Sequence, residues 1–312
     1  MSAKYSPPSQ PTTHRGASTR DETRPARRER PRFRRTRAGL VLDDALGHHV
    51  TMRLVDERVF AATPAALRRT ARVLLARGAA RGLLSFGVAD THLHAVLACD
   101  RATAGVFAQT VEASLRAVLS LPVPFEAARI RPIVEQRHLA HAVRYALRQD
   151  ARHGLALDPC RDGSALPELL AMRVVDTHLA ARVAARLPRW SRAELLALLG
   201  VELAPGPLDF AQLADAAAAA FALPELDGQD AERSTARRAA VQLALAAGLR
   251  TRRVAELLSV TARSAQRLAL APAPRAALRA VELQLRLRTA LAARERGDID
   301  AEGRSAADPP LG

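Results

Sequence analysis

The run Leu83-Leu84-Ser85-Phe86-Gly87-Val88 is separated by a turn at Asp90-Thr91 from the run His92-Leu93-His94-Ala95-Val96-Leu97-Ala98-Cys99. Short apolar runs bounded by turn residues are typical of β-strands, so the sequence predicts a β-hairpin here. Working outward, a strand is predicted at residues 49–55, which alternate and contain β-branched side chains, and a fourth at residues 125–130.

Helices are predicted between and after these strands. Thr63-Pro64 predicts the start of the first helix, as N-cap and first-turn proline. Apolar residues at helical spacing predict a second helix at about 102–119, and a third is predicted at 139–149. The order β-α-β-β-α-β-α predicts an α+β fold: a ferredoxin-like antiparallel sheet with helices on one face and one trailing helix.

The rest of the chain is predicted to be all-α. It is rich in Ala and Leu, and breaks at Pro188, Pro205-Gly206-Pro207 and Pro224 separate its elements. The predicted organisation is a disordered basic tail at 1–38, a catalytic domain at 39–155, a helical connector at 156–228, a helix-turn-helix domain at 229–295 and a disordered tail at 296–312.

The composition excludes several classes of protein. With 47 Lys and Arg residues against 32 Asp and Glu, the chain carries a formal charge of +15, so we expect it to bind phosphate backbones in a salt-dependent way. Only two cysteines are present, which excludes a disulfide scaffold and a four-cysteine zinc site. No stretch approaches the roughly 18 uninterrupted apolar residues of a membrane span, and the N-terminus lacks the apolar segment of a secretory signal. We therefore expect a cytoplasmic, nucleoid-associated protein with no membrane partner.

Two local patterns carry candidate chemistry. On a strand, His92 and His94 lie on the same face and can converge on one point. Taken alone, such a pair is more often two partly exposed histidines than a metal centre. On a helix, the spacing of Tyr145 and Gln149 brings phenol and amide to one face. The alternative for Tyr145 is a half-buried side chain with its hydroxyl in water.

Together these patterns resemble the single-tyrosine HUH transposases, and most closely the REP-associated tyrosine transposase branch. The similarity covers about residues 30–175: an Arg-rich lead-in, the strand His49-Val50-Thr51, the motif His92-Leu93-His94 and the run Tyr145-Ala146-Leu147-Arg148-Gln149 before Arg152-His153-Gly154-Leu155. Members usually read Pro-Asn-His where this chain has Asp90-Thr91-His92, and Asn-Pro where Gln149-Asp150 stands. Neither departure removes a catalytic group.

The resemblance implies a site and a reaction. His92, His94 and Gln149 would hold Mg²⁺ or Mn²⁺ beside the scissile phosphate of single-stranded or hairpin DNA. Tyr145 would attack that phosphorus to give a covalent 5′-phosphotyrosine and a free 3′-hydroxyl. The flanking Arg144 and Arg148 would bind the DNA. The resemblance leaves open whether the protein is a monomer or a homodimer with exchanged active-site helices.

Two residues near these motifs are given no catalytic part. We expect His49 to be a strand residue without a metal contact. Asp150 follows Gln149 directly and so points away from the face of Tyr145. No general base for Tyr145 is therefore evident from the sequence.

A second resemblance concerns the helical half. Residues 233–288 carry twelve arginines against Glu256 and Glu282, and they predict a helix at 235–247, a second capped by Thr251 and a third capped by Thr261. The last two resemble the helix-turn-helix of the C-terminal DNA-binding domain of chromosomal replication initiators. It implies base contacts from Arg263, Gln266 and Arg267, and phosphate contacts from Arg250, Arg252 and Arg253, on duplex DNA. The alternative is a basic helical bundle with a solvated face.

A non-catalytic function is the alternative to the enzyme. A domesticated transposase could retain binding and lose cleavage, and would then act as a DNA- or RNA-binding regulator. RNA-binding sheets of this type normally stack bases on two or three aromatic side chains. Phe86 is the only aromatic residue in the two strands of the hairpin, which weakens this alternative.

Overall fold

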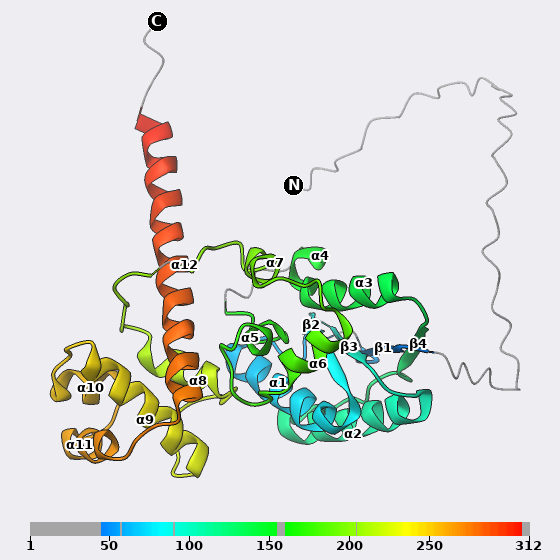
Figure 1. Ribbon diagram of the computed structural model, residues 1–312, viewed down its shortest axis with the longest axis horizontal. Coiled ribbons are helices and arrows are strands. Elements are labelled where there is room, and N and C mark those ends of the chain that lie inside the picture. The colour runs from blue at the N-terminus through cyan, green and yellow to red at the C-terminus, as the bar shows by residue number, and fades with distance from the viewer. Residues whose placement is uncertain (1–44, 57, 90, 155–159, 204, 308–312) are drawn as a thin grey trace, which may run out of the picture. The chain divides into compact units, whose positions relative to one another are not determined.

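The computed structural model describes residues 45–56, 58–89, 91–154, 160–203 and 205–307, with side chains through residue 296 (Figure 1). The described chain is an α+β protein that combines a four-stranded antiparallel sheet with many helices. The predicted tail at 1–38 lies outside the described residues. The domain boundaries given above stay predictions.

The sheet contains four strands in the order β2-β3-β1-β4. Their bounds are β1 Gly47–Arg53, β2 Leu83–Val88, β3 His92–Leu97 and β4 Arg129–Ile133. All three pairings are antiparallel, and Thr51 of β1 lies opposite both His94 of β3 and Arg129 of β4. Gly87 of β2 lies on the other side of His94. Because directly paired residues share a face, Gly87, His94, Thr51 and Arg129 form one row across the sheet.

The fourth strand begins later than we predicted. Phe125 forms only an isolated bridge with Leu54, beyond the end of β1, and its ring packs edge-on against Phe60. Continuous pairing starts at Arg129 and includes Pro132. A proline is tolerated because β4 is the edge strand, where a missing N–H breaks no ladder.

Helices cover both faces of the sheet (Figure 1). These helices are α1 Pro64–Gly78, α2 Arg101–Leu119 and α3 Gln136–Leu147. A 3₁₀ turn, η1 at Ala79–Arg81, follows α1. The Thr63 side chain caps α1 as predicted, accepting from the backbone of Ala66. We predicted helices on one face, which α1 and α2 satisfy. The trailing helix α3 packs on the opposite face, where the Val143 carbonyl accepts a hydrogen bond from Ser85 of β2.

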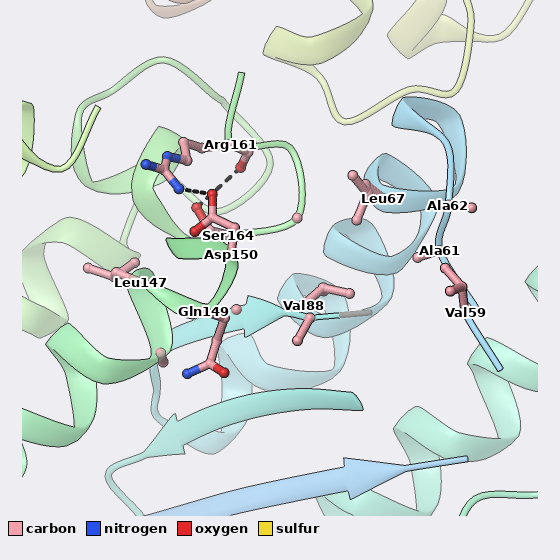
Figure 2. Close-up of a pocket in the computed structure, with 14 residues that line it drawn as sticks. Val59, Ala61, Ala62, Leu67, Val88, Leu147, Gln149, Asp150, Arg161 and Ser164 are labelled. Atoms are coloured by element: carbon pink, nitrogen blue, oxygen red, sulfur yellow. Dashed lines mark hydrogen bonds and ion pairs between the residues drawn. The ribbon is translucent and has the colours of Figure 1, made fainter. Parts of the chain in front are cut away.

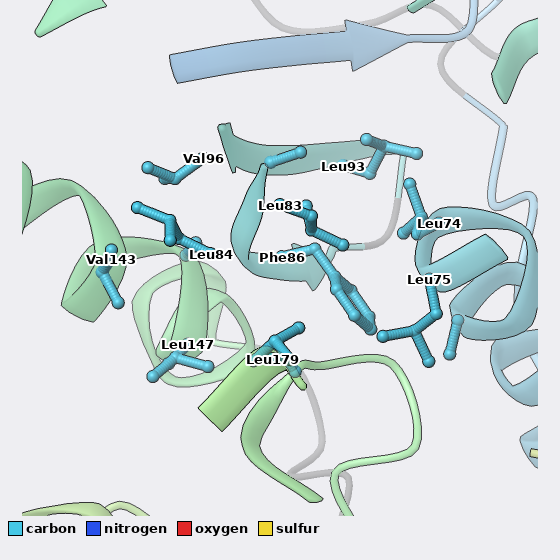
Figure 3. Packing of buried hydrophobic residues seen from close by; sticks show 14 of the residues in the cluster. Leu74, Leu75, Leu83, Leu84, Phe86, Leu93, Val96, Val143, Leu147 and Leu179 are labelled. Atoms are coloured by element: carbon cyan, nitrogen blue, oxygen red, sulfur yellow. The ribbon is translucent and has the colours of Figure 1, made fainter. Parts of the chain in front are cut away.

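The main core lies between the sheet and these helices. Figure 3 shows Phe86 near Leu75 of α1, and Leu84 and Val96 near Val143 of α3. All five side chains are almost completely buried. The same core continues into the chain after α4 (Gln149–His153), with helices α5 Leu166–Leu169, α6 Leu179–Arg186 and α7 Arg192–Ala197.

The segment 163–165 pairs with the outer edge of β2. The Val88 N–H donates to the Gly163 carbonyl, and the Ala165 N–H donates to the Phe86 carbonyl. This edge of the sheet is therefore covered rather than open.

A second core is formed by the later helices. They are α8 Leu213–Ala220, α9 Ala231–Ala246, α10 Thr251–Leu257, α11 Ala262–Leu270 and α12 Arg275–Ala307. The Thr261 side chain caps α11 as predicted, but Thr251 is the first residue of α10, and the N-cap is Arg250, whose side chain makes no capping bond. Helix α12 is helical through Ala307, within the range 296–312 that we predicted to be a disordered tail.

An ion pair with a buried arginine connects α1, which belongs to the main core, with α8, which belongs to the second core. Arg68 of α1 is only 2% exposed, and it pairs with Asp162 at 2.8 Å and with Asp215 of α8 at 2.7 Å. Burial would by itself raise the pKa of Asp215, but Arg288 of α12 and Arg68 hold that pKa below its ordinary value. Arg68 has two counter-charges, so its buried guanidinium is compensated.

Candidate functional site

Four histidine and tyrosine rings meet on the face of the sheet that α3 covers. The ring centroid of His94 lies 4.8 Å from that of His92, 5.1 Å from that of His49 and 5.1 Å from that of Tyr145. His92 and His94 share this face because they are two residues apart on β3. His49 joins them because Thr51, two residues further along β1, lies opposite His94.

His94 is held by two polar groups of β1. Its Nδ1 lies 3.0 Å from Nε2 of His49 and 3.1 Å from Oγ1 of Thr51. Its Nε2 is buried and has no hydrogen-bond partner in the described chain. Buried polar atoms are nearly always satisfied in proteins, so this nitrogen calls for an explanation.

Burial keeps the central imidazoles neutral. It lowers the pKa of His94 to about 2, and the charges of the neighbouring imidazoles and of Arg152 act in the same direction. Burial also lowers the pKa of His49 to about 4, with a further contribution from Arg131. Both rings are therefore uncharged at neutral pH, which is the protonation state that a metal ligand requires.

Tyr145 and Gln149 come together across a break in the helix, whereas the sequence predicts one continuous helix through both. Helix α3 ends at Leu147, Arg148 has φ −116° and ψ 28°, and α4 begins at Gln149. The Gln149 amide donates to the Tyr145 carbonyl at 2.8 Å. The side chain thus replaces part of the helical hydrogen bonding that the break removes.

His153 completes the group on α4. Its Nε2 lies 3.2 Å from Oε1 of Gln149, and its ring centroid lies 4.8 Å from that of His92. Arg152, the preceding residue, places its guanidinium 4.7 Å from the centre of the Tyr145 ring. Asp150 makes an ion pair with Arg161, on the other side of α4 from this group.

A cavity of about 410 Å³ opens beside His94 and Tyr145. Its wall carries arginine and histidine side chains from β1, β3, β4, α3 and α4, and no acidic side chain is among the described residues that line it. The lining residues are His49, Thr51, His94, Arg129, Arg131, His138, His141, Ala142, Tyr145 and Arg152. Such a wall attracts anions.

A second cavity, of about 380 Å³, is lined by Gly87 and Gln149 among other residues (Figure 2). Figure 2 shows Asp150, Arg161 and Ser164 on one side of it and the apolar side chains of Val59, Leu67 and Val88 on the other. Arg161 also donates to the Leu198 carbonyl at 2.6 Å. The polar groups here are already paired within the protein.

Two of the predicted DNA-binding residues, Arg144 and Arg148, are exposed and line a further hollow of about 340 Å³ together with Tyr145 and Arg152. Arg144 pairs with Glu194 at 3.6 Å. The predicted contacts of the helical half are all exposed: Arg250, Arg252 and Arg253 around α10, and Arg263, Gln266 and Arg267 on α11. Glu256 pairs with Arg252 and with Arg253.

Sequence reasoning assigned no part to several residues of this group. The shared face of His49 and Thr51 is readable from their spacing on a strand, but their position beside His94 depends on the register between β1 and β3. His153 follows Gln149 by four residues, a spacing that signals a shared helix face. Arg131 was missed because it lies beyond the fourth strand as predicted at 125–130. Arg129 lay within that prediction, but its position beside Thr51 depends on the register between β1 and β4.

The residues present suit a divalent cation, although the site is not a preformed cage. Within the described ranges, no group of three or more His, Cys, Asp or Glu side chains is arranged to hold a metal ion. The donors are nevertheless appropriate: the imidazole of His92, the amide oxygen of Gln149, and the neutral imidazole of His94, whose buried Nε2 has no partner among the described residues.

Comparison with models of known families, with curated proteins and with solved structures finds no match for this chain. Among the described residues, no helix is both long and apolar enough to cross a membrane.

Proposed function

We propose that this protein is a metal-dependent, transposase-like endonuclease and strand transferase that cleaves single-stranded DNA at hairpin-forming repeats. The observation that carries the proposal is the meeting of His92 and His94 with Tyr145: the three rings form a chain of contacts of about 5 Å, next to the Gln149 amide. Nucleophile and candidate cation ligands thus lie within reach of one phosphodiester.

Tyr145 is the proposed nucleophile. Its phenolic oxygen bonds to phosphorus, the bond from phosphorus to the 3′ oxygen breaks, the phenol proton leaves, and the released 3′ oxygen takes up a proton. The strand keeps a 5′-phosphotyrosine link, so a second 3′-hydroxyl can reverse the step without ATP. Arg152, stacked on the Tyr145 ring, can balance the negative charge of the phosphate as the phenol approaches.

His92, His94 and Gln149 would hold the cation, with His153 as an additional donor. A Mg²⁺ or Mn²⁺ ion bound there supplies Lewis-acid polarisation of the phosphate oxygens. Arg129 and Arg131 would bind neighbouring phosphates of the strand in the cavity beside Tyr145.

The fold is consistent with this function in both halves. We propose that the sheet is ferredoxin-like, supported by the order β2-β3-β1-β4 and by the two crossover helices on one face. We propose that α10 and α11 form a helix-turn-helix on duplex DNA: Thr261 caps α11, Ala265 is its only fully buried residue, and Arg263, Gln266 and Arg267 are exposed. We expect such a protein to act in the cytoplasm, at the nucleoid, as a monomer or homodimer.

The test is covalent capture of DNA. Wild-type protein, incubated with Mn²⁺ and a labelled hairpin oligonucleotide with single-stranded flanks, is expected to give a protein–DNA adduct that survives denaturation. Mass spectrometry should locate the nucleotide on Tyr145. Tyr145→Phe should abolish the adduct while hairpin affinity stays within a few-fold, because the phenyl ring keeps the packing.

The alternative is a DNA- or RNA-binding regulator without cleavage. The exposed arginines of α10 and α11 favour it, because they would bind nucleic acid whether or not Tyr145 reacts. Cleavage by Tyr145→Phe would show that another nucleophile acts. Absence of an adduct with wild type, together with metal-independent hairpin binding, would establish the regulator.

A further inference from the structure

We propose that His49 and Thr51 are positioning residues for His94: they accept the proton of His94 Nδ1, so that the His94 Nε2 lone pair faces the cation. This inference rests on the proposed function, since it concerns the same cation site. It differs from the sequence-based expectation, which gave His49 no part in the site.

The hydrogen bonds around His94 allow two arrangements. In the first, Nδ1 carries the proton and donates it to Nε2 of His49, at 3.0 Å, or to Oγ1 of Thr51, at 3.1 Å. In the second, Nδ1 is bare and accepts from one of these groups. A neutral imidazole has a single N–H, so the second arrangement puts the proton on Nε2.

The surroundings of Nε2 distinguish the two arrangements. This atom is buried and has no partner among the described residues. In the second arrangement it would be a buried N–H without an acceptor, a rare and costly state. In the first it is a bare lone pair, which a cation satisfies directly.

The two β1 side chains are held where this function needs them. The register of β1 against β3 places Thr51 directly opposite His94, and His49 is two residues away on the same face. Neutral imidazole in water favours the Nε2–H form, so an Nδ1–H form at His94 requires a fixed acceptor. Second-sphere acceptors of this kind set the tautomer of metal-ligating histidines in general.

The first measurement reads the tautomer directly, in metal-free protein. Long-range ¹⁵N–¹H correlation spectra of the full chain, recorded near pH 7.5, report which nitrogen of each histidine is protonated. The His94 signals are identified by their loss in His94→Gln. We expect a protonated Nδ1 and a bare Nε2. A protonated Nε2, or rapid exchange between the two forms, would overturn the proposal.

The second measurement is Co²⁺ affinity, followed by visible absorbance, because imidazole binds Co²⁺ more tightly than Mg²⁺ or Mn²⁺. The double variant His49→Leu/Thr51→Val removes both acceptors while leaving His92, His94 and Gln149 intact. We expect it to bind Co²⁺ about 10- to 100-fold more weakly than wild type. The single variant His49→Gln keeps a side-chain acceptor oxygen at position 49 and leaves Thr51 unchanged. Its Co²⁺ affinity should therefore stay within a few-fold of that of wild type.

Controls separate this proposal from the proposed function. His178→Gln removes an exposed histidine that precedes α6 and should not change the Co²⁺ affinity. Equal affinity in the double variant and wild type would refute the positioning role while leaving the cation site intact. If wild type binds no Co²⁺, the cation site itself fails, and the tautomer spectrum still decides the state of His94.

Discussion

Gly87 lies opposite His94 across the β2–β3 pair, and a Cβ built at Gly87 would stand 1.8 Å from the carbonyl oxygen of Ala146. Backbone of α3 therefore rests on backbone of β2, one residue from Tyr145. No side chain larger than hydrogen fits between them, so this glycine sets how closely the phenol approaches the histidines.

Gly87→Ala is predicted to damage both the fold and the site. The end of α3 would have to move away from β2, and overpacking of this kind costs roughly 1–3 kcal/mol of the free energy of unfolding. Chemical denaturation and the yield of covalent adduct measure the two effects. Gly105→Ala is the matched control: a Cβ there meets only the end of the Arg101 side chain, at 3.6 Å, and in a helix this change should stabilise by roughly 0.5–1 kcal/mol. Equal stability of the two variants would contradict the close packing.

Arg129→Gln/Arg131→Gln is predicted to weaken binding of single-stranded DNA. Both guanidinium groups line the cavity beside Tyr145, and removing each phosphate-binding guanidinium should reduce the slope of log K against log[salt] by about 0.7. Fluorescence anisotropy at several salt concentrations gives this slope. Arg116 is an exposed residue of α2, on the opposite face of the sheet, so Arg116→Gln should leave the salt slope unchanged.

The stability of the metal-free protein is predicted to fall as the pH drops below about 6.5. In the unfolded chain the imidazoles take up protons there, whereas folded His49 and His94 stay neutral down to a pKa of about 4 and about 2. The stabilisation of the folded state by these two neutral imidazoles is fully present above the pKa of histidine in the unfolded chain. Below it, the free energy of unfolding falls by about 1.4 kcal/mol per pH unit for each group. The neighbouring groups whose charges lower the pKa of His94 further are His49, His92, His153 and Arg152, and the Tyr145 phenol also faces it.

His94→Gln removes one of these two contributions. Urea denaturation between pH 6 and pH 4.5 should therefore give a slope of stability against pH that is shallower in the variant by about 1 kcal/mol per unit. An identical slope would mean that His94 is protonated in the folded protein.

Arg68→Leu is predicted to destabilise the protein by roughly 3–5 kcal/mol, because it leaves the buried Asp162 without its shortest partner. Thermal or urea unfolding measures this loss. Arg69→Leu, on the exposed side of the same helix, should change stability by less than about 0.5 kcal/mol.

Two classes of contact are predicted in the helical half. Arg263→Ala should reduce discrimination between duplex sequences, because α11 would present this side chain to base edges. Arg252→Ala should weaken binding to all duplexes about equally and lower the salt slope. Binding to a set of randomised duplexes compares the two. If Arg263→Ala weakened binding to every duplex sequence equally, the helical half would be a basic bundle that binds DNA without contacting base edges.

Periodicity predicted the elements well where one face is buried and one is not. The strands around His92 and His94, the Thr63 cap and the helix capped by Thr261 were all evident, since each follows from local chemistry. The fourth strand was displaced because Phe125 looks like a strand residue but pairs only once, and pairing with β1 determines where β4 begins.

The site was predictable in part. His92 and His94 come together through their spacing on one strand, so the sequence could suggest this pair. The spacing of Tyr145 and Gln149 also suggested a pair, but the contact between them is from the Gln149 amide to the Tyr145 backbone carbonyl, across a break in the helix. The break at Arg148 and the contact of His49 with His94 depend on how α3 and β1 pack against neighbours far away in the chain. Such relationships leave no trace in the spacing of residues.

Arg161 and Asp162 are adjacent, yet the first binds Asp150 on α4 and the second binds Arg68 on α1. The next residues shield the edge of β2. A fragment ending at residue 154 would therefore leave the outer edge of β2 exposed, where a second copy of the chain could pair with it. It would also leave the buried guanidinium of Arg68 without a counter-charge. Because Asp215 of α8 also pairs with Arg68, and Leu283 and Leu287 of α12 belong to the main core, the portion of the chain to express for the tyrosine chemistry includes these later helices.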